Sequence, residues 1–439
     1  LAAMNVFSIN LALFKECWQS LKWFRVALSA VLVWAVLRLL MQLALTFDPS
    51  SSSISIDLQV YLDAAQNFVR RADLYPKSLE ILEYHFPYPP IFALLFVPFY
   101  YLPKQITVII QLALHIFAFY LLFAQWSQLF REWGLEKASK YLVLSAPIWL
   151  LFSPFWDDLL YLNIYTLMAL LGTLLFRAIL KENLPLSALW LTLILISKPH
   201  WAFAAIIPLF FRRYAFFVKL ILGTLTGYLL LALITFLAGG FEYVGGQYLD
   251  YFALLGRLGQ DFPWREAASG FMGYNHSIKQ IFAFFLGASP ATLLIASLVK
   301  GLLLLPLAWN ALRFIFGPEI QSRQHTVVAF EMFMALYLGV FLWLDILWEA
   351  FLAIAIFGYL MSILEGRFSR MAVLIVTILY AILDLWRLIL YLIGAPMLDD
   401  YYLLWDYSIY IPIVMLVILV YYFVLTQKLI LVRPGQNQA

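Results

Sequence analysis

Apolar runs of about 20 residues recur from one end of the chain to the other, and they limit its fold more than any other feature. A helix of that length spans the hydrocarbon core of a lipid bilayer, which is roughly 30 Å thick. The chain is 64% hydrophobic and only 12% charged, whereas a soluble globular domain carries about twice that share of charge. We therefore expect an all-α polytopic membrane protein that forms a single integral membrane domain over residues 1–439.

The apolar runs predict about twelve membrane crossings. Segment 88–102 is ambiguous, because about 15 residues between two proline-containing ends are few for a full crossing. We expect this segment to be re-entrant or broken rather than a span. The predicted spans are 26–47, 105–128, 141–153, 159–177, 186–197, 201–211, 215–237, 290–314, 327–343, 347–364, 371–392 and 408–427.

The distribution of lysine and arginine orients these spans. If 88–102 does not cross, every basic cluster falls on the same side as the N-terminus, and the positive-inside rule makes that side the cytoplasm. Both termini are then cytoplasmic, and we expect a multi-pass protein of the inner (plasma) membrane. The clusters contain Lys15, Lys22, Arg25, Arg131, Lys137, Lys140, Arg177, Lys181, Arg212, Arg213, Arg313, Arg323, Arg367, Arg370, Lys428 and Arg433.

The external face then collects the other polar segments, including two large loops at 48–87 and 238–278. The short spans 186–197 and 201–211 meet at a polar break, which is typical of a broken helix pair that faces a cavity. The smaller external segments are Trp156-Asp157-Asp158, Lys198-Pro199-His200, Asp345 with Glu349, and 396–407.

The first external loop is the most informative segment. Leu58, Leu62, Ala65 and Val69 recur at helical spacing, which predicts an amphipathic external helix along the membrane surface. Asp57 stands at its start, and two interpretations are open. It is either the N-cap of the helix or a general base at the mouth of a membrane cavity, where partial burial would raise its pKa towards neutrality.

Two further places offer polar side chains on the external side. Lys198 lies at the helix break, and it either snorkels to the interface or binds the phosphate or pyrophosphate of a lipid. Asn275, His276 and Ser277 end the second loop. They suit sugar hydroxyls or phosphate oxygens, but they equally suit a helix start with Asn275 or Ser277 as the cap.

Other function classes find no support in the sequence. It contains no Walker-type phosphate loop, no Gly-rich dinucleotide motif, no HExxH helix and no paired-cysteine site. The five histidines are scattered, so we predict no metal site and no cofactor. A net charge of +3 gives no indication of nucleic-acid binding. The single cysteine, Cys17, cannot form an internal disulfide, and no cleaved signal peptide is expected before the long run at 26–47.

Several motifs carry a resemblance to a known family. They are Asp57-Leu-Gln-Val-Tyr61-Leu-Asp-Ala64-Ala65, Asp73-Leu74-Tyr75-Pro76, Phe86-Pro87-Tyr88-Pro89-Pro90, Pro98, and Leu102-Pro103. Together they resemble the first external loop of the GT-C glycosyltransferases. They are most similar to the polyprenol-phosphate-mannose-dependent α-mannosyltransferases of glycosyltransferase family 87.

Weaker matches to the same family follow along the chain. Ser197-Lys198-Pro199, followed by Arg212-Arg213, resembles its lysine-proline segment, and Asn275-His276-Ser277-Ile278 resembles its Asn-x-Ser-Leu segment. The chain also departs from the family pattern. The departures are Arg71 in place of a glycine, Leu160-Tyr161-Leu162-Asn163 in place of Gly-Gln-x-Asn, and Ala350-Phe351 after Trp348-Glu349 in place of a histidine pair.

The resemblance implies an inverting transfer of a hexose, expected to be mannose, on the external face. The donor is a polyprenyl-phosphate sugar and the acceptor a glycolipid or glycan. Asp57 would be the catalytic base, as the aspartate after the first span is in that family. Lys198, and then His276, would balance the charge of the donor phosphate. The expected substrate contacts are Tyr61, Tyr88, Asn163, His200, Asn275 and Ser277.

Two alternatives from other classes remain open. A lipid-linked sugar flippase or transporter also has broken helices, but it usually shows repeat symmetry and acids inside its spans. The acids of this chain are instead predicted in external loops. An O-antigen-type polymerase or ligase would use a pyrophosphate-linked donor and call for more external arginines than this chain offers. The external arginines are Arg70, Arg71, Arg257 and Arg265.

Overall fold

The computed structural model describes residues 11–48, 55–75, 86–260, 277–287, 289–317, 322–344, 350–394 and 407–432. Within these residues the regular structure is helical, as the apolar runs predict. Seven of the described helices are long and apolar enough to cross a membrane, or eight if one bent pair counts as a span. Four more apolar helices have only 10–17 residues, so the predicted number of about twelve crossings is not confirmed.

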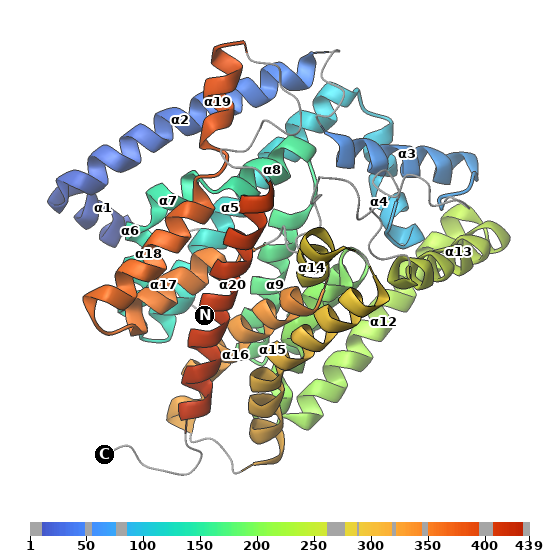
Figure 1. The fold of residues 1–439 in the computed structure, drawn as a ribbon. Helices are drawn as coiled ribbons and strands as arrows, with labels where there is room; N and C mark the ends of the chain where they lie inside the picture. The colour runs from blue at the N-terminus through green and yellow to red at the C-terminus, as the bar shows by residue number, and fades with distance from the viewer. Residues whose placement is uncertain are drawn as a thin grey trace.

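Figure 1 shows the arrangement of the helices. In the first half of the chain they are α1 (Leu11–Ser20), α2 (Lys22–Phe47), α3 (Ile56–Arg70), α4 (Pro90–Tyr100), α5 (Lys104–Glu132), α6 (Glu136–Leu144), α7 (Ala146–Leu150), α8 (Ser153–Tyr161), α9 (Tyr165–Leu180), α10 (Leu184–Leu195), the 3-10 helix η2 (Pro199–Ile206) and α11 (Ile207–Phe210). In the second half they are α12 (Tyr214–Gly239), α13 (Phe241–Gln260), α14 (Ile278–Leu286), α15 (Pro290–Phe316), α16 (Ser322–Trp343), α17 (Ala353–Ile363), α18 (Arg367–Ala381), α19 (Leu385–Leu392) and α20 (Tyr407–Leu431).

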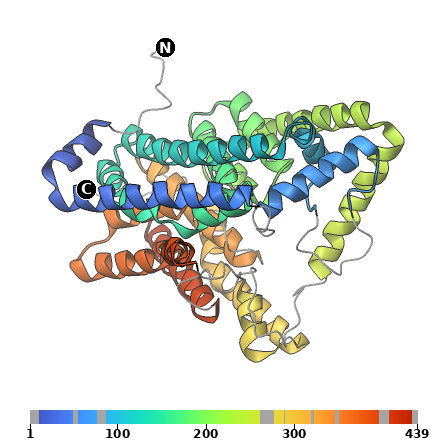
Figure 2. The ribbon, with the colours of Figure 1, turned by 90° about the horizontal axis from the view of Figure 1, so that it is seen from above.

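The helix predicted after the first span is present as α3, which buries Leu58, Leu62 and Ala65. Val69, the fourth residue of the predicted apolar stripe, is exposed instead, because it lies in the last turn of the helix. In the view from above, the end of α2 and the start of α3 lie close together near the middle of the molecule (Figure 2). Lys104 at the start of α5 donates from Nζ to Oε1 of Gln59 in α3, at 3.0 Å. Helix α4 packs on α3, and its 11 residues span only about 16 Å. Whether 88–102 crosses the membrane stays a prediction.

The borders of two predicted spans differ from the structure. The sequence suggested an external break at 156–158, between the spans 141–153 and 159–177. These three residues instead lie inside α8 and are buried. The chain bends by 113° just after α8, where Leu162 adopts a left-handed conformation with φ of 54°. The sequence pattern of these residues predicted a loop, because the residues that pair with the two buried aspartates, Arg387 and His115, are distant in the sequence.

Buried ion pairs join α8 to both ends of the chain. Arg38 of α2 donates from Nε to Oδ2 of Asp384, which caps α19, at 3.2 Å. Arg387 of α19 contacts Asp384 Oδ1 at 3.0 Å and also pairs with Asp157 of α8. Since an isolated buried charge is costly, each carboxylate here has an arginine beside it. The network fixes α8, and with it the bend that follows.

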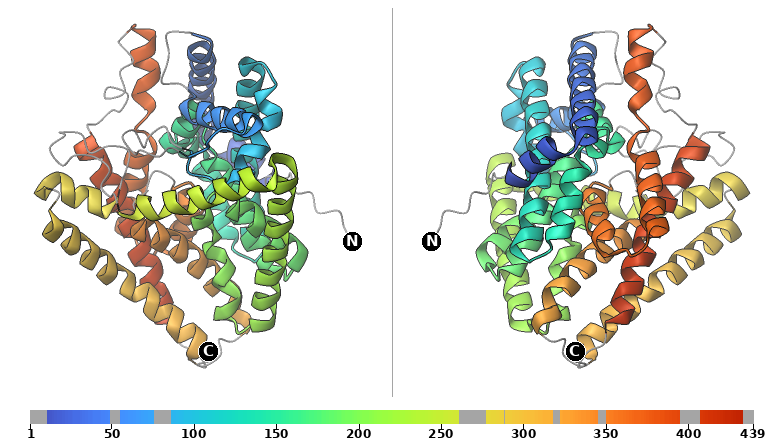
Figure 3. Two further views of the ribbon diagram at one scale, coloured as in Figure 1. Left: turned by 90° about the vertical axis from the view of Figure 1, so that its right-hand side faces the viewer. Right: turned by 90° about the vertical axis from the view of Figure 1, so that its left-hand side faces the viewer.

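The segment predicted as the second large loop contains helix α13. It runs across the end of α12 (Figure 3), and the two helices meet at Gly239 and Gly240. Gly240 has a φ of 92°, and a Cβ on Gly239 would come within 2.9 Å of the Phe68 ring in α3, so the corner needs glycine. Tyr243 of α13 donates from its hydroxyl to the backbone oxygen of Ala72, at 2.7 Å. Helix α13 therefore contacts the C-terminal end of α3 and holds it in position.

Candidate active site

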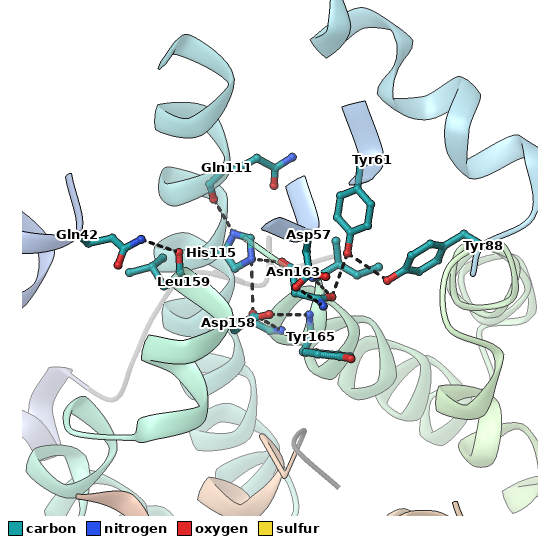
Figure 4. Close-up of polar contacts among 12 residues, drawn as sticks. Gln42, Asp57, Tyr61, Tyr88, Gln111, His115, Asp158, Leu159, Asn163 and Tyr165 are labelled. Carbon is teal, nitrogen blue, oxygen red and sulfur yellow. Dashed lines mark hydrogen bonds and ion pairs between the residues drawn. The ribbon is translucent and has the colours of Figure 1, made fainter. Parts of the chain in front are cut away.

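The carboxylate of Asp57 lies at the centre of a polar cluster between α3, α4, α9 and η2 (Figure 4). Asp57 is the second residue of α3, and its side chain is partly buried. The helix is capped at Ser55, in a left-handed conformation and without a side-chain cap. The interpretation of Asp57 as the N-cap is therefore wrong. Its Oδ2 instead accepts a hydrogen bond from Nδ2 of Asn163, at 2.9 Å.

Asn163 lies in the bend between α8 and α9, and its amide is held from both sides. Its Oδ1 accepts from the backbone N–H of Ile164 at 2.7 Å and from the hydroxyl of Tyr61 at 3.1 Å. These donors leave Nδ2 to face Asp57. The phenol oxygens of Tyr61 and Tyr88 are 3.1 Å apart. One hydrogen-bonded chain therefore runs from Asp57 through Asn163 to two tyrosines.

Asp158 and His115 contact the backbone around the bend between α8 and α9. Neither was predicted as a site residue. Asp158 Oδ2 accepts from the backbone N–H of Thr166 at 2.9 Å, and Oδ1 accepts from that of Tyr165 at 3.2 Å. It thus caps the first turn of α9, where backbone donors lack helical partners. His115 of α5 lies 3.5 Å from Asp158 Oδ2 and contacts the backbone oxygen of Asn163.

Lys198 supplies a positive charge beside this cluster. It lies at the break between α10 and η2, so the predicted broken helix pair is present, with its second part largely a 3-10 helix. The Lys198 Nζ is 3.5 Å from the centroid of the Tyr165 ring and 5.7 Å from that of the Tyr88 ring. Cations are attracted to the faces of such rings. Its charge also lowers the pKa of Asp57.

The structure thus brings together five of the predicted residues: Asp57, Tyr61, Tyr88, Asn163 and Lys198. The other predicted contacts have different outcomes. His200 lies against the rings of Trp201 and Phe341. Ser277 is the N-cap of α14, where its Oγ accepts from the backbone N–H of Gln280 at 3.0 Å. Other residues singled out in the sequence lie outside the described residues, among them Asn275, His276, Asp345, Trp348 and Glu349.

Burial raises the pKa of Asp57 from 3.8 to about 6. Lys198 and the hydrogen bond from Asn163 work against this effect, whereas the charge of Asp158 adds to it. The carboxylate is therefore ionised at neutral pH, yet basic enough to take a proton from a reacting hydroxyl. Among the described residues, no three His, Cys, Asp or Glu side chains gather as metal ligands.

This pKa leads to a prediction on pH dependence. If Asp57 acts as a general base, its carboxylate is the active form, so we expect activity above pH 6 and its loss as the pH falls through the pKa of about 6. We expect kcat/KM to fall about tenfold per pH unit below that point. The measurement is a pH–rate profile, with size-exclusion chromatography at each pH as the control for folding. An acid limb near pH 4, or none, would contradict the assignment.

The family model described as glycosyltransferase family 87 matches residues 86–342, which is more than half of the chain. The matched range contains Tyr88, Asn163 and Lys198, while Asp57 precedes it. No curated protein matches the chain.

Proposed function

This chain belongs to glycosyltransferase family 87. We therefore propose that it transfers a hexose, with mannose as the expected sugar, from a polyprenyl-phosphate donor to a glycolipid or glycan acceptor. Family membership and the apolar helices make it a membrane glycosyltransferase. One observation supports the finer proposal: a partly buried carboxylate at Asp57 with an oriented amide, Asn163, and a cation, Lys198, at its side.

In the proposed reaction Asp57 accepts the proton of an acceptor hydroxyl as the hydroxyl oxygen attacks the anomeric carbon of the donor. The new C–O bond forms on the face opposite the phosphate, and the bond from the anomeric carbon to the phosphate oxygen breaks. Polyprenyl phosphate leaves with the bonding electrons. A single displacement inverts the anomeric centre, so a β-linked donor gives an α-linked product.

The leaving phosphate gains negative charge in this step and needs a cation in place beforehand. Lys198 has that role in the proposal, because a fixed charge stabilises the transition state without reorganisation of the site. The hydroxyls of Tyr61 and Tyr88 are placed to orient a sugar, since they continue the chain of hydrogen bonds from Asn163. Asn163 itself orients the base.

We place this site on the external face of the inner membrane, with the lipid tail of the donor in the bilayer. The support comes from the basic residues, which the positive-inside rule puts on the opposite, cytoplasmic side.

The test is donor cleavage by the purified protein in lipid nanodiscs, with labelled polyprenyl-phosphate mannose and a lipid extract as the source of acceptors. We expect release of polyprenyl phosphate and an α-linked labelled product, and no turnover of a nucleotide sugar. In sealed vesicles, movement of intact donor without cleavage would support a flippase instead. Turnover of a pyrophosphate-linked donor alone would support the polymerase or ligase.

A further inference from the structure

Tyr165, the first residue of α9, has its ring face against the ammonium group of Lys198, with 3.5 Å between Nζ and the ring centroid. Its position is set by its backbone, which donates to Oδ1 of Asp158 at 3.2 Å. The ring therefore stands on the capped first turn of a helix, in a fixed place relative to Asn163. Nothing in the sequence singled out this tyrosine.

A ring face suits this lysine for a physical reason. Lys198 has a flexible four-carbon stem, and the anionic Asp57 lies close enough for its pKa to respond to the lysine charge. An aromatic face attracts a cation through its quadrupole, so the Tyr165 ring restrains the ammonium group without adding a negative charge beside it. The second ring, that of Tyr88, lies 5.7 Å from Nζ.

We propose that Tyr165 is a positioning residue, whose ring face holds the Lys198 ammonium group in place and charged for the donor phosphate. The proposal rests on the function proposed above for Lys198. The Tyr165–Lys198 contact can also be measured without any turnover. One readout therefore tests the contact, and the other tests the role of Lys198 at the donor phosphate.

The first readout is kcat/KM for the donor in a series of ring variants. Tyr165→Phe keeps the ring face, and we expect less than about a threefold loss, whereas Tyr165→Leu removes the face and is expected to lose about 5–30-fold. Mono-, di- and trifluorophenylalanine at position 165 keep the shape of phenylalanine and weaken its quadrupole step by step. Activity is expected to fall in that order, which a purely structural ring would not cause.

The second readout is the acylation of Lys198 by an amine-reactive ester, followed by mass spectrometry of its peptide. Only the neutral amine reacts, so acylation is expected to become faster as fluorination weakens the hold on the ammonium form. The isosteric fluorinated residues serve here even if Tyr165→Leu does not fold. The same fluorinated residues at Phe252, an exposed ring on α13, are the matched control and should change neither readout.

The outcomes are distinct. Falling activity together with faster acylation supports the proposal. If neither readout follows fluorination, the ring does not hold the lysine and the proposal is overturned. If acylation follows fluorination but transfer does not, the Tyr165–Lys198 contact is supported, and the donor-phosphate role of Lys198 is overturned.

Discussion

Asp57→Asn is expected to lower the rate of sugar transfer by about 10²–10⁴-fold, the usual contribution of a general base. Asparagine has nearly the shape of aspartate, so the packing of α3 against α4 should persist. What is lost is the group that takes the proton of the acceptor hydroxyl. The measurement is the initial rate of product formation at pH 7.5 with saturating donor.

Asp63→Asn is the matched control for this experiment. Asp63 is an exposed carboxylate on the same helix, where it accepts from Nε2 of Gln59 at 2.8 Å. We expect its replacement to leave the rate unchanged. Equal losses in the two variants would show that the charge of α3, rather than the base at Asp57, supports activity.

The stability of Asp57→Asn gives a further check on the same variant. A carboxyl whose pKa rises from 3.8 to about 6 on folding destabilises the folded state when it is ionised at neutral pH. The neutral asparagine at position 57 removes this free-energy cost of folding. The cost is about 1–2 kcal/mol after allowance for solvent screening. The inactive variant should therefore unfold at an equal or higher temperature. An inactive variant that unfolds earlier would indicate a structural role for Asp57.

Lys198→Met is expected to lower kcat by about 10²–10³-fold, as is typical when one group that stabilises developing charge is lost. Methionine keeps much of the apolar length of the lysine stem but lacks its charge. The effect should fall more on kcat than on the KM for the donor, since the phosphate bears more charge in the transition state than in the bound donor.

The control is Lys104→Met, at the start of α5, where the lysine is exposed and its Nζ donates to Gln59. This variant loses a lysine that contacts α3 without touching the proposed phosphate site, so it should retain its rate. A normal kcat in Lys198→Met would contradict the assignment. A loss confined to KM would make the lysine a binding group only.

Much of the candidate site could be predicted because its residues stand at interruptions of the apolar pattern. Lys198 is a charge at a helix break, and Asp57 stands at the start of an amphipathic helix. Tyr61 and Tyr88 belong to motifs with a family resemblance. The structure adds the hydrogen bonds that join Asp57 and Tyr61 to Asn163, and the ring contacts that place Lys198 beside Tyr88.

The supporting residues could not be predicted, because their partners are far away in the sequence. His115 lies inside an apolar span, where a lone histidine gives no signal of its contact with a residue 48 positions further on. Asp158 looked like part of an external break, since its role as the cap of α9 depends on the bend at Leu162. Asp157 beside it is buried only because Arg387 meets it from the far end of the chain.

The spread of the site along the chain bears on how the protein is made. Its parts emerge from the ribosome in the order Asp57, Tyr88, Asn163 and Lys198. Asn163 is available once the bend before α9 has formed, but until η2 has been inserted and packed the carboxylate lacks its nearby cation. A growing chain therefore gains the complete constellation only after α9 and α10 are in the bilayer. Insertion factors that act on these helices would then decide when the enzyme first becomes competent.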